Sequence, residues 1–428
     1  DHRDLHSFPT RRSSDLPDFR ARLQQLETLE PRTPRSAVVR ALDREFPRWR
    51  SARITLAPRP LAEGSVAMVI AFFAGQTSQN NPGRNGVFKL LKPGIERRLA
   101  EDLEIWSTLG EFLDEDCERY HLPGLNYQET FETVRDLLVH EIKLDEEQAH
   151  LAEAAREYAG WDRVLVPALF PFCTPRLTAM EHLPGEPLTH ALARPGANGE
   201  RLAPLIAEAL VARPVFSAAG DALFHADPHA GNLLVTPAGR LGILDWSLAG
   251  RLRKADRIEL VQLLLGALTL DAGRMESVVL RLSRHPPAVS TLARVIDRSL
   301  RELRWGRFPG VAWLTRLLDG VVVQAGARLR PNFLLFRKSL LTLEGVLADL
   351  TPPDGPDGSL HLDGAMLAGF ARQFAAEWPE RLVHRPDSRA LHTHLSSADL
   401  LGLLWSFPAT LTRFWTGAWK DVVRKAEG

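Results

Sequence analysis

The 428-residue sequence has little cysteine, no excess charge of either sign and no long apolar run. Its two cysteines, Cys117 and Cys173, have no neighbour at the spacing of a metal or redox motif. A chain of this length without a disulfide framework fits a reducing compartment such as the cytosol. Lysine plus arginine number 53, as do aspartate plus glutamate. Because nucleic-acid binding usually needs a basic face, we expect no nucleic-acid partner.

A transmembrane helix needs roughly 18 to 20 uninterrupted apolar residues, and no window of the sequence supplies them. The nearest approach is the segment 400–419, which Pro408 and Arg413 interrupt. Its tryptophans and the following Lys420 suit a helix lying at a membrane surface, but they equally suit a helix packed on the protein's own core. We favour the core for this segment. The sequence thus predicts a cytoplasmic protein, with peripheral attachment to the inner face of the membrane as an open alternative.

Residues 1–16 differ from the rest of the chain. They are charged, lack periodicity and contain no apolar segment of the kind found in signal peptides. They resemble a translated sequencing adapter. We therefore expect this tract to be non-native and leave it out of the fold prediction.

Short apolar runs and turn residues dominate the first part of the chain. Residues 66–73 and 87–91 predict two buried strands, and the turn-rich segment 80–86 between them predicts a hairpin. Apolar residues at helical spacing follow, ending in a predicted helix over 131–155. After residue 254 the sequence is almost entirely leucine-rich helix.

This order of elements predicts an α+β fold with two lobes. Residues 17–182 would form a small mixed α/β lobe with inserted helices, and residues 183–428 a larger, mainly helical lobe.

The segment 224–250 carries the most informative motif. Asn232 follows Asp227 by five residues, and Asp245 comes thirteen residues later, beyond a predicted hairpin. Kinases use this arrangement: one aspartate orients or deprotonates the attacking group, while an asparagine and a second aspartate bind the Mg²⁺ that bridges the phosphates. Mg²⁺ prefers oxygen ligands. We therefore predict that Asp227 is catalytic and that Asn232 and Asp245 bind the metal.

This segment has two other interpretations. His225, Asp227 and His229 alternate, as ligands of a transition metal on a strand would. However, Pro228 and the Gly-Asn pair at 231–232 interrupt such a strand. The same residues could also serve only as turn formers. The matching interval to a second aspartate beyond the hairpin argues against that.

A kinase also needs a strand lysine for the α- and β-phosphates and a helix glutamate to hold that lysine. Lys89 lies within the predicted strand 87–91, where an unpaired lysine would be costly unless it faced solvent. Glu141 and Glu147 are candidate partners from the predicted helix. They are six residues apart, about 600° of rotation, so only one can face Lys89. Either glutamate could instead lie on an exposed helix face.

A phosphate-covering loop should precede the first strand. The segment 62–65 holds Ala62, Glu63, Gly64 and Ser65 there. Three of these residues are small, so backbone N–H groups could approach phosphates. A single glycine is weak evidence by itself.

Taken together, these motifs resemble the UbiB/AarF family of atypical kinases, which is tied to ubiquinone and isoprenoid-lipid metabolism. The resemblance extends from about residue 16 to about residue 352 and implies a protein-kinase-like two-lobe fold. It implies that the alanine-containing loop 62–65 covers the nucleotide and that Lys89 is the nucleotide lysine. It also implies that Glu147 is the partner of Lys89, and that a hinge from Glu181 to Leu183 contacts adenine through its backbone.

The sequence departs from the family pattern at three places. Lys143 stands where the family has an aspartate, two residues after Glu141. Ser247 replaces the glycine of the Asp-Phe-Gly motif. The family's Lys-x-Gly-Gln segment, expected just before residue 16, is absent, and the adapter-like tract stands in its place. These departures bear on regulation more than on nucleotide binding.

The residues and the resemblance together predict an atypical kinase or ATPase that uses ATP or ADP with Mg²⁺. Its expected partners are nucleotide, a lipid or membrane surface, and proteins of quinone biosynthesis; oligomeric state and phosphoryl acceptor are left open. One alternative is a small-molecule phosphotransferase of the aminoglycoside- or choline-kinase type, because residues 244–246 nearly match the Ile-Asp-Trp of those enzymes. Another is a nucleotide-binding pseudokinase scaffold, which Lys143 and Ser247 would suit.

Overall fold

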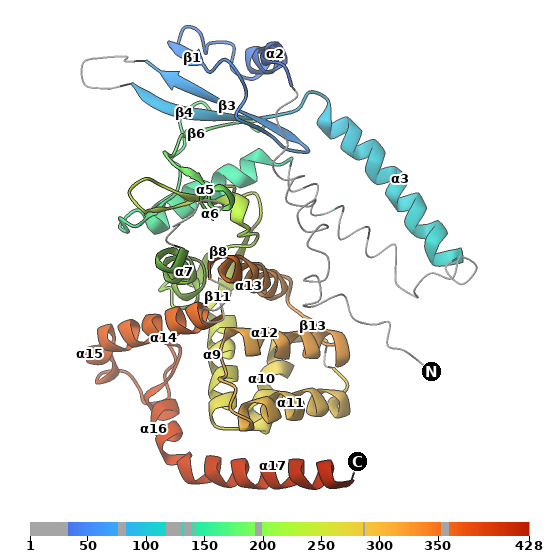
Figure 1. Ribbon diagram of the computed structural model, residues 1–428, viewed down its shortest axis with the longest axis vertical. Coiled ribbons are helices and arrows are strands. Elements are labelled where there is room, and N and C mark those ends of the chain that lie inside the picture. Colours follow the sequence, from blue (N-terminus) through green and yellow to red (C-terminus); the bar gives the residue numbers. More distant parts are fainter. Residues whose placement is uncertain are drawn as a thin grey trace. The chain divides into compact units, whose positions relative to one another are not determined.

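The computed structural model divides the chain into two compact units (Figure 1). The first unit comprises the described residues up to Ala159, together with Val166–Pro184 and Asp245–Ser247; the second comprises Gly160–Leu165, Gly185–Leu244 and Leu248 onward. The predicted lobe boundary at 182/183 stays a prediction, and the tract 1–16 lies outside the described residues. The structure describes residues 33–75, 83–116, 131, 135, 139, 142–192, 199–285, 287–351 and 359–427.

An antiparallel sheet organises the first unit. Its strand order is β1-β3-β4-β6, and the short β2 pairs with β3. The predicted hairpin is confirmed, since β3 and β4 pair along their length; residues 76–82 between them are not described. The strands are β1 (Ile54–Leu56), β2 (Ala62–Glu63), β3 (Ala67–Ala74), β4 (Arg84–Leu91) and β6 (Leu177–Glu181).

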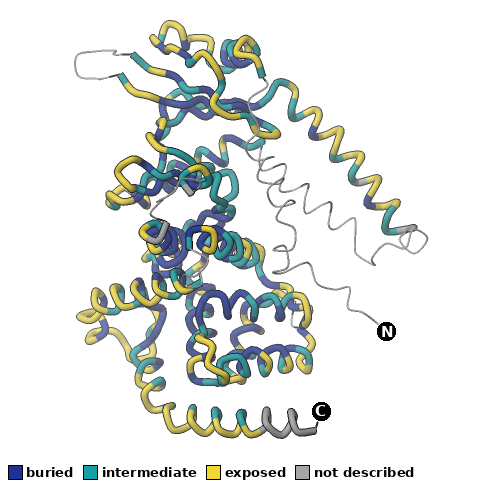
Figure 2. The backbone as a smooth tube through the Cα atoms, in the orientation of Figure 1, coloured by how far each residue is buried: buried dark blue, intermediate teal, exposed yellow. Residues whose placement is uncertain are grey.

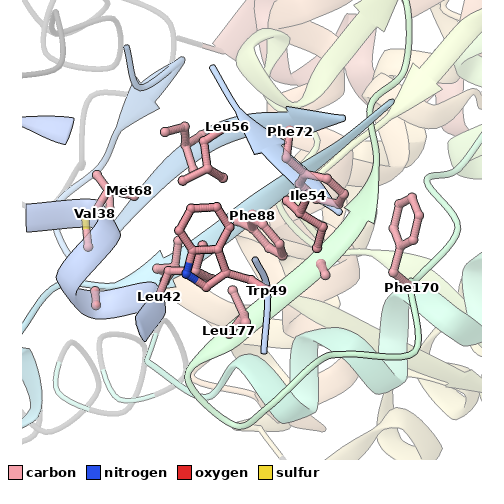
Figure 3. Close-up of a cluster of buried hydrophobic side chains, with 14 residues drawn as sticks. Val38, Leu42, Trp49, Ile54, Leu56, Met68, Phe72, Phe88, Phe170 and Leu177 are labelled. Atoms are coloured by element: carbon pink, nitrogen blue, oxygen red, sulfur yellow. The ribbon is translucent and has the colours of Figure 1, made fainter. Parts of the chain in front are cut away.

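One face of this sheet carries an aromatic core (Figure 3). Strand alternation directs Phe88 and Leu90 of β4 to this face, where Phe72 stacks on Phe88 with ring centroids 4.1 Å apart. The helix α2 (Arg35–Glu45) covers it with Leu42 and its neighbours. Because Phe88 and Leu90 point into this core, the residue between them must point to the other face.

The other face of the sheet meets a helix. Leu91 of β4 packs with Ala67 and with Leu144, the first residue of α5 (Leu144–Tyr158). Gln148 of α5 donates hydrogen bonds to the carbonyl oxygens of Thr174 and Leu177, which holds the helix beside β6. The predicted helix over 131–155 is confirmed from Leu144 onward, but it is not continuous, because Ile142 and Lys143 are not helical and α5 begins after them. The unit also contains α3 (Ile95–Asp116).

Two small sheets begin the second unit. The strands β9 (Leu233–Val235) and β10 (Leu241–Ile243) form the predicted hairpin within a sheet of order β5-β10-β9-β7. A separate antiparallel pair joins β8 (Asp221–His225) to β11 (Ala249–Arg253). The remaining strands are β5 (Val164–Leu165), β7 (Glu186–Pro187), and the pair β12 (Ser283–His285) and β13 (Arg328–Leu329).

Helices form the rest of the second unit, as their apolar periodicity predicts. In α11, for example, Leu292, Val295, Ile296 and Leu300 are buried at helical spacing. The α-helices are α6 (Leu188–Leu192), α7 (Gly199–Ala207), α8 (Arg213–Val215), α9 (Lys254–Leu268), α10 (Ala272–Leu282), α11 (Val289–Arg304), α12 (Val311–Asp319), α13 (Pro331–Leu350), α14 (Ser359–Ala376), α15 (Trp378–Arg381), α16 (Ser397–Trp405) and α17 (Phe407–Glu427). A 3₁₀ turn, η3 (Ala230–Asn232), and two π-helical segments, η2 (Glu208–Ala212) and η4 (Gly320–Gln324), complete it.

The segment 400–419 corrects the sequence prediction in part: Leu400 and Leu403 of α16 pack on the core, but the tryptophans do not. Trp405 and Trp415 are 82% and 69% exposed, and Figure 2 shows α17 largely exposed. The reason is Arg413, which faces inward and donates to the carbonyl oxygen of Thr269. Since the polar side of α17 makes the attachment, its apolar side is left outside. Among the described helices, none combines the length and apolarity needed to cross a bilayer.

Candidate active site

Lys89 lies at the centre of a charged cluster in the first unit. Its Nζ is 2.8 Å from Oε1 of Glu147 and 3.2 Å from Oδ2 of Asp245. Lys89 lies on the face of β4 opposite Phe88 and Leu90, and Glu147 lies one turn after the packed Leu144 of α5. The packing of α5 against β4 therefore brings the carboxylate of Glu147 to the lysine.

This cluster is largely removed from water. The side chains of Lys89 and Glu147 are 12% and 2% exposed, whereas that of Asp245 is 38% exposed. Burial alone would lower the pKa of Lys89, but the carboxylates of Asp245 and Glu147 outweigh it and raise that pKa. Lys89 is thus held as a cation. Asp245 is the carboxylate that solvent or a ligand can reach.

The two carboxylates respond to this environment in opposite ways. Burial raises the pKa of Glu147 more than the charge of Lys89 lowers it. Burial also acts to raise the pKa of Asp245, but Lys89 and the hydrogen bonds from Ser247 outweigh it and hold that pKa well below its usual range. Asp245 is therefore ionised at neutral pH, as a ligand of Mg²⁺ must be.

Glu147 occupies the first turn of α5, where the helix dipole favours a carboxylate. Its Oε1 accepts from Lys89, while its buried Oε2 has no hydrogen-bond partner among the described residues. The structure therefore pairs Lys89 with Glu147. The alternative partner, Glu141, lies outside the described residues.

Local backbone geometry sets the position of Asp245. This residue has a left-handed conformation with φ of 46°, which aspartate tolerates because its side chain can bond to nearby backbone. Its Oδ1 accepts from the backbone N–H of Ser247 at 3.1 Å. Next to it, the carbonyl oxygen of Trp246 lies 3.1 Å from Nδ1 of His150 on α5. These contacts show how a serine can follow the Asp-Trp pair, because Ser247 donates hydrogen bonds to Asp245 from both its backbone and its side chain.

The loop after β8 contains Asp227 and belongs to the second unit. His225, fully buried, accepts from the N–H of Asp227 at Nδ1 and lies 3.0 Å from the carbonyl oxygen of Leu244 at Nε2. With Nδ1 as acceptor, Nε2 must carry the proton and donate, so the ring is neutral. The histidine thus ties the loop to the end of β10.

Asn232 is also fixed by the backbone. Its side-chain amide nitrogen donates to the backbone carbonyl oxygen of Asp227 at 3.1 Å. Its backbone carbonyl oxygen accepts from the N–H of Leu244 at 2.8 Å. The side-chain oxygen of Asn232 is therefore the atom left to bind a metal. The residue after Leu244 in the chain is Asp245. That Asn232 and Asp245 share one Mg²⁺ stays a prediction.

The transition-metal interpretation of this loop is not supported. Both ring nitrogens of His225 face backbone groups, and Nδ1 of His229 accepts from the N–H of Gly231 at 3.1 Å. Over the described ranges, no three histidine, cysteine, aspartate or glutamate side chains are grouped closely enough to hold a metal ion. These histidines shape the loop.

The sequence did not reveal the residues of α13 that hold this loop. Nζ of Lys338 is 3.1 Å from Oδ1 of Asp227, and Oγ of Ser339 donates to the carbonyl oxygen of His225 at 2.9 Å. Both residues belong to a helix with an ordinary apolar stripe. No local pattern could have identified them, because their partners lie more than a hundred residues earlier in the chain.

The loop predicted to cover the phosphates begins in β2, a short strand that pairs antiparallel with β3. Ala62 and Glu63 form β2, and Gly64 donates to the carbonyl oxygen of Ala67 at 2.9 Å. The carboxylate of Glu63 is 2.8 Å from Nζ of Lys92 and accepts from Thr33. The side chain of Glu63 is therefore occupied and is not available to a phosphate.

The predicted hinge continues from β6. Glu181 pairs with Gly86 of β4 and donates its N–H to the carbonyl oxygen of Ala168 at 2.8 Å. Leu183, two residues later, is buried. Contact of this segment with adenine stays a prediction.

Comparison with known proteins extends these observations. The ABC1 atypical kinase-like domain matches residues 30–279, more than half of the chain. A protein of Aeromonas salmonicida named "Probable protein kinase UbiB" is 28% identical over 310 residues, covering 68% of this chain and 54% of that protein. The chain thus spans about half the length of this curated relative.

A solved structure shares the fold. The Mycobacterium tuberculosis protein Rv3197, determined in complex with erythromycin, has a TM-score of 0.54 and 21% sequence identity, covering 79% of this chain and 85% of its own. The likeness confirms the predicted kinase-like α+β fold. The domain match covers more than half of the chain, so the chain belongs to the ABC1 (UbiB/AarF) family of atypical kinases.

Proposed function

We propose that this protein is an atypical kinase or ATPase that binds Mg-ATP and cleaves the bond to its γ-phosphate. One observation carries the proposal: a buried strand lysine, Lys89, is held as a cation by Glu147 and by Asp245, whose carboxylate remains reachable. Kinases use this combination to bind nucleotide phosphates and metal. A lysine serving only stability would not need a second, half-exposed carboxylate.

Each residue has a distinct task in this proposal. The ammonium group of Lys89 binds oxygens of the α- and β-phosphates, and Glu147 positions it. Asp245 and the side-chain oxygen of Asn232 hold Mg²⁺, which neutralises charge on the phosphate oxygens. These residues align the γ-phosphate and stabilise its charge.

Asp227 acts on the attacking group. As the γ-phosphoryl group passes to an acceptor oxygen, the bond to ADP breaks and the acceptor proton moves to the carboxylate of Asp227. With water as acceptor the same steps give ATP hydrolysis. Lys338, whose Nζ lies 3.1 Å from Oδ1 of Asp227, keeps this carboxylate oriented.

The proposal places this activity in lipid or quinone metabolism. The resemblance to the UbiB/AarF family implies that setting, and the exposed tryptophans of α16 and α17 suit a lipid surface. We propose peripheral attachment of the chain to the inner face of the membrane, with quinone-biosynthesis proteins as partners.

Thermal unfolding with and without Mg-ATP or Mg-ADP tests nucleotide binding. A ligand at about 100 times its Kd should add about 2.7 kcal/mol to the free energy of unfolding. Asp245→Asn should abolish the Mg²⁺-dependent part of this stabilisation, whereas Asp102→Asn, exposed on α3, should retain it. If the wild-type protein shows no stabilisation by Mg-nucleotide, the proposal is wrong.

Turnover separates the remaining candidates. Mg-dependent release of phosphate from ATP, alone or with anionic vesicles, supports the enzyme, and Asp227→Asn should abolish it. Binding without turnover would identify a pseudokinase scaffold. Phosphate transfer to an aminoglycoside, choline or a sugar would instead identify a small-molecule phosphotransferase.

A further inference from the structure

The helical unit contains an apolar cavity of about 250 Å³. Side chains of α9, α13, α14 and α16 line it, together with Val211 of the π-helical segment η2. π-Helical turns are rare and occur frequently at functional sites. Leu268, Phe308 and Leu367 line the cavity and are themselves about half exposed, which opens it to solvent.

The lining excludes a charged occupant. Its one ionisable side chain, Asp363, accepts a hydrogen bond at 2.6 Å from the N–H of Val311, the first residue of α12. That carboxylate therefore caps a helix. The remaining lining side chains offer water no hydrogen-bond partner, so the cavity favours apolar molecules. The chemistry favours an uncharged, hydrocarbon-rich ligand.

The helix α13 joins this cavity to the loop of Asp227. Phe336 and Leu340 of α13 line the cavity, and the ring of Phe336 packs edge-on against Phe224 of β8 with centroids 5.3 Å apart. The residues between them, Lys338 and Ser339, contact Asp227 and the carbonyl oxygen of His225. One rigid helix thus contacts the cavity and both ends of the segment 225–227.

We propose that this cavity is a regulatory site that binds the hydrocarbon chain of an uncharged small molecule, and that α13 couples its occupancy to the position of Asp227. The ligand fills space next to Phe336 and Leu340 and so favours one position of the helix. Binding does not depend on the proposed kinase activity; only the coupling rests on it. Failure of the two can therefore be told apart.

Fluorescence of N-phenyl-1-naphthylamine, an uncharged apolar probe, measures binding. The probe should saturate at one site per chain and be displaced by 1-octanol, 1-nonanol and 1-decanol. Affinity should rise about fourfold per added methylene, equivalent to about 0.8 kcal/mol, until the cavity is full and the series levels off. Decanoate should compete far more weakly because its charge finds no partner.

Variants locate the site. Leu264→Trp fills the cavity from α9 and should weaken probe binding at least tenfold. Leu280→Trp, a half-exposed leucine on α10 away from the cavity, should leave it unchanged. Trp415→Ser removes exposed apolar surface on α17 and should also leave it unchanged. Probe binding that does not saturate would contradict the proposed site. So would a Leu264→Trp protein that has wild-type thermal stability and still binds the probe with full affinity.

Turnover tests the coupling. Saturating 1-decanol should change kcat for Mg-ATP hydrolysis in the wild type, and Ser339→Ala, which cuts the contact to His225, should reduce that response while probe affinity is retained. Coupling is reciprocal for binding. Mg-ADP should therefore change the affinity of the protein for the probe. The probe should change the affinity of the protein for Mg-ADP by the same factor. An unchanged kcat together with unchanged affinities would refute the coupling and leave the cavity as a simple binding site.

Discussion

At the scale of single residues, the paired charges of Lys89 and Glu147 show how a buried ion pair behaves. Neither side chain can be solvated in place, since 12% and 2% of their surfaces are exposed. Removing one partner leaves the other as an uncompensated buried charge, which costs more than the pair contributes. Function rather than stability is therefore the reason to place a lysine on this face of the sheet.

The change Lys89→Met should lower the free energy of unfolding by about 3 to 5 kcal/mol, because Glu147 would lose its cationic partner. The double change Lys89→Met with Glu147→Leu should recover much of that loss. Urea denaturation measures both. The matched control is Lys143→Met, whose pair with Glu146 is solvent-exposed and should matter little. An equal effect of the two lysine changes would contradict the buried-pair interpretation.

His394 is a second residue whose ionisation affects folding. Burial lowers its pKa to about 4, and the charges of Arg257 and Lys254 act in the same direction. Its Nε2 is 2.8 Å from the carbonyl oxygen of Val215, while its buried Nδ1 has no partner among the described residues. The neutral ring is therefore the form that fits the fold.

Because the folded-state pKa of His394 lies below its unfolded value, its contribution is present above about pH 6.5 and is lost as the pH falls towards 4. Between pH 7 and pH 5 this loss should be about 2 kcal/mol. The variant His394→Asn should lack this part of the pH dependence; asparagine suits the left-handed backbone, with φ of 59°. Urea denaturation midpoints measured between pH 7 and pH 5 test this prediction. If the midpoints of both proteins fall in parallel with pH, the pH dependence does not come from His394.

At the scale of elements, close backbone approach explains a glycine beside β7. Gly185 has φ of 153°, and a Cβ there would lie 2.5 Å from the carbonyl oxygen of Val235 and 2.2 Å from the side chain of Leu234. Only glycine lets the chain run this close to β9 while entering the second unit. The pairing of β7 with β9 in the small sheet depends on this contact.

Gly185→Ala should therefore destabilise the protein by about 3 kcal/mol through strain and overpacking. Thermal unfolding measures the loss. Gly160→Ala is the control, because a Cβ there meets no atom within 4 Å. If Gly185→Ala is as stable as Gly160→Ala, the backbone at residue 185 relaxes without cost.

At the scale of the whole molecule, exposed apolar surface is concentrated near the C-terminal end of the described chain. Trp405, Trp415 and Trp419 are each about 70% exposed or more. Tryptophan is enriched at membrane–water interfaces, where its ring lies at the level of the headgroups. A zero net charge supplies no long-range attraction to an anionic surface, so these rings would have to provide most of the binding energy.

Replacing these three tryptophans by serine should weaken binding to phosphatidylglycerol-containing vesicles, by about tenfold per ring if each buries its apolar surface in the interface. Sedimentation with vesicles measures this. Serine at Trp305 and Trp378, which are 59% and 55% exposed elsewhere in the second unit, is the matched control. Equal losses in both variants would mean that α16 and α17 form no specific lipid-binding surface.

Much of the fold was predictable because strands and helices depend on residues close in sequence. The alternation around Phe88 and Leu90 places Lys89 on the opposite face of β4, and the interval from Asp227 to Asn232 indicates a kinase loop. The tryptophan-rich part of the segment 400–419 was predicted incorrectly for the same reason, whereas Leu400 and Leu403 do pack on the core. Its apolar composition suits either a core or a surface, and only the inward contact of Arg413 with Thr269 decides between them.

The sequence by itself determined the strand that carries Lys89, the loop of Asp227 and the family to which the chain belongs. Only the tertiary structure decided that Glu147 meets Lys89, that Lys338 and Ser339 hold the loop from α13, and that an apolar cavity lies along the same helix. The physical reason is distance along the chain: periodicity and turn chemistry act over a few residues, whereas these contacts join segments that packing alone brings together.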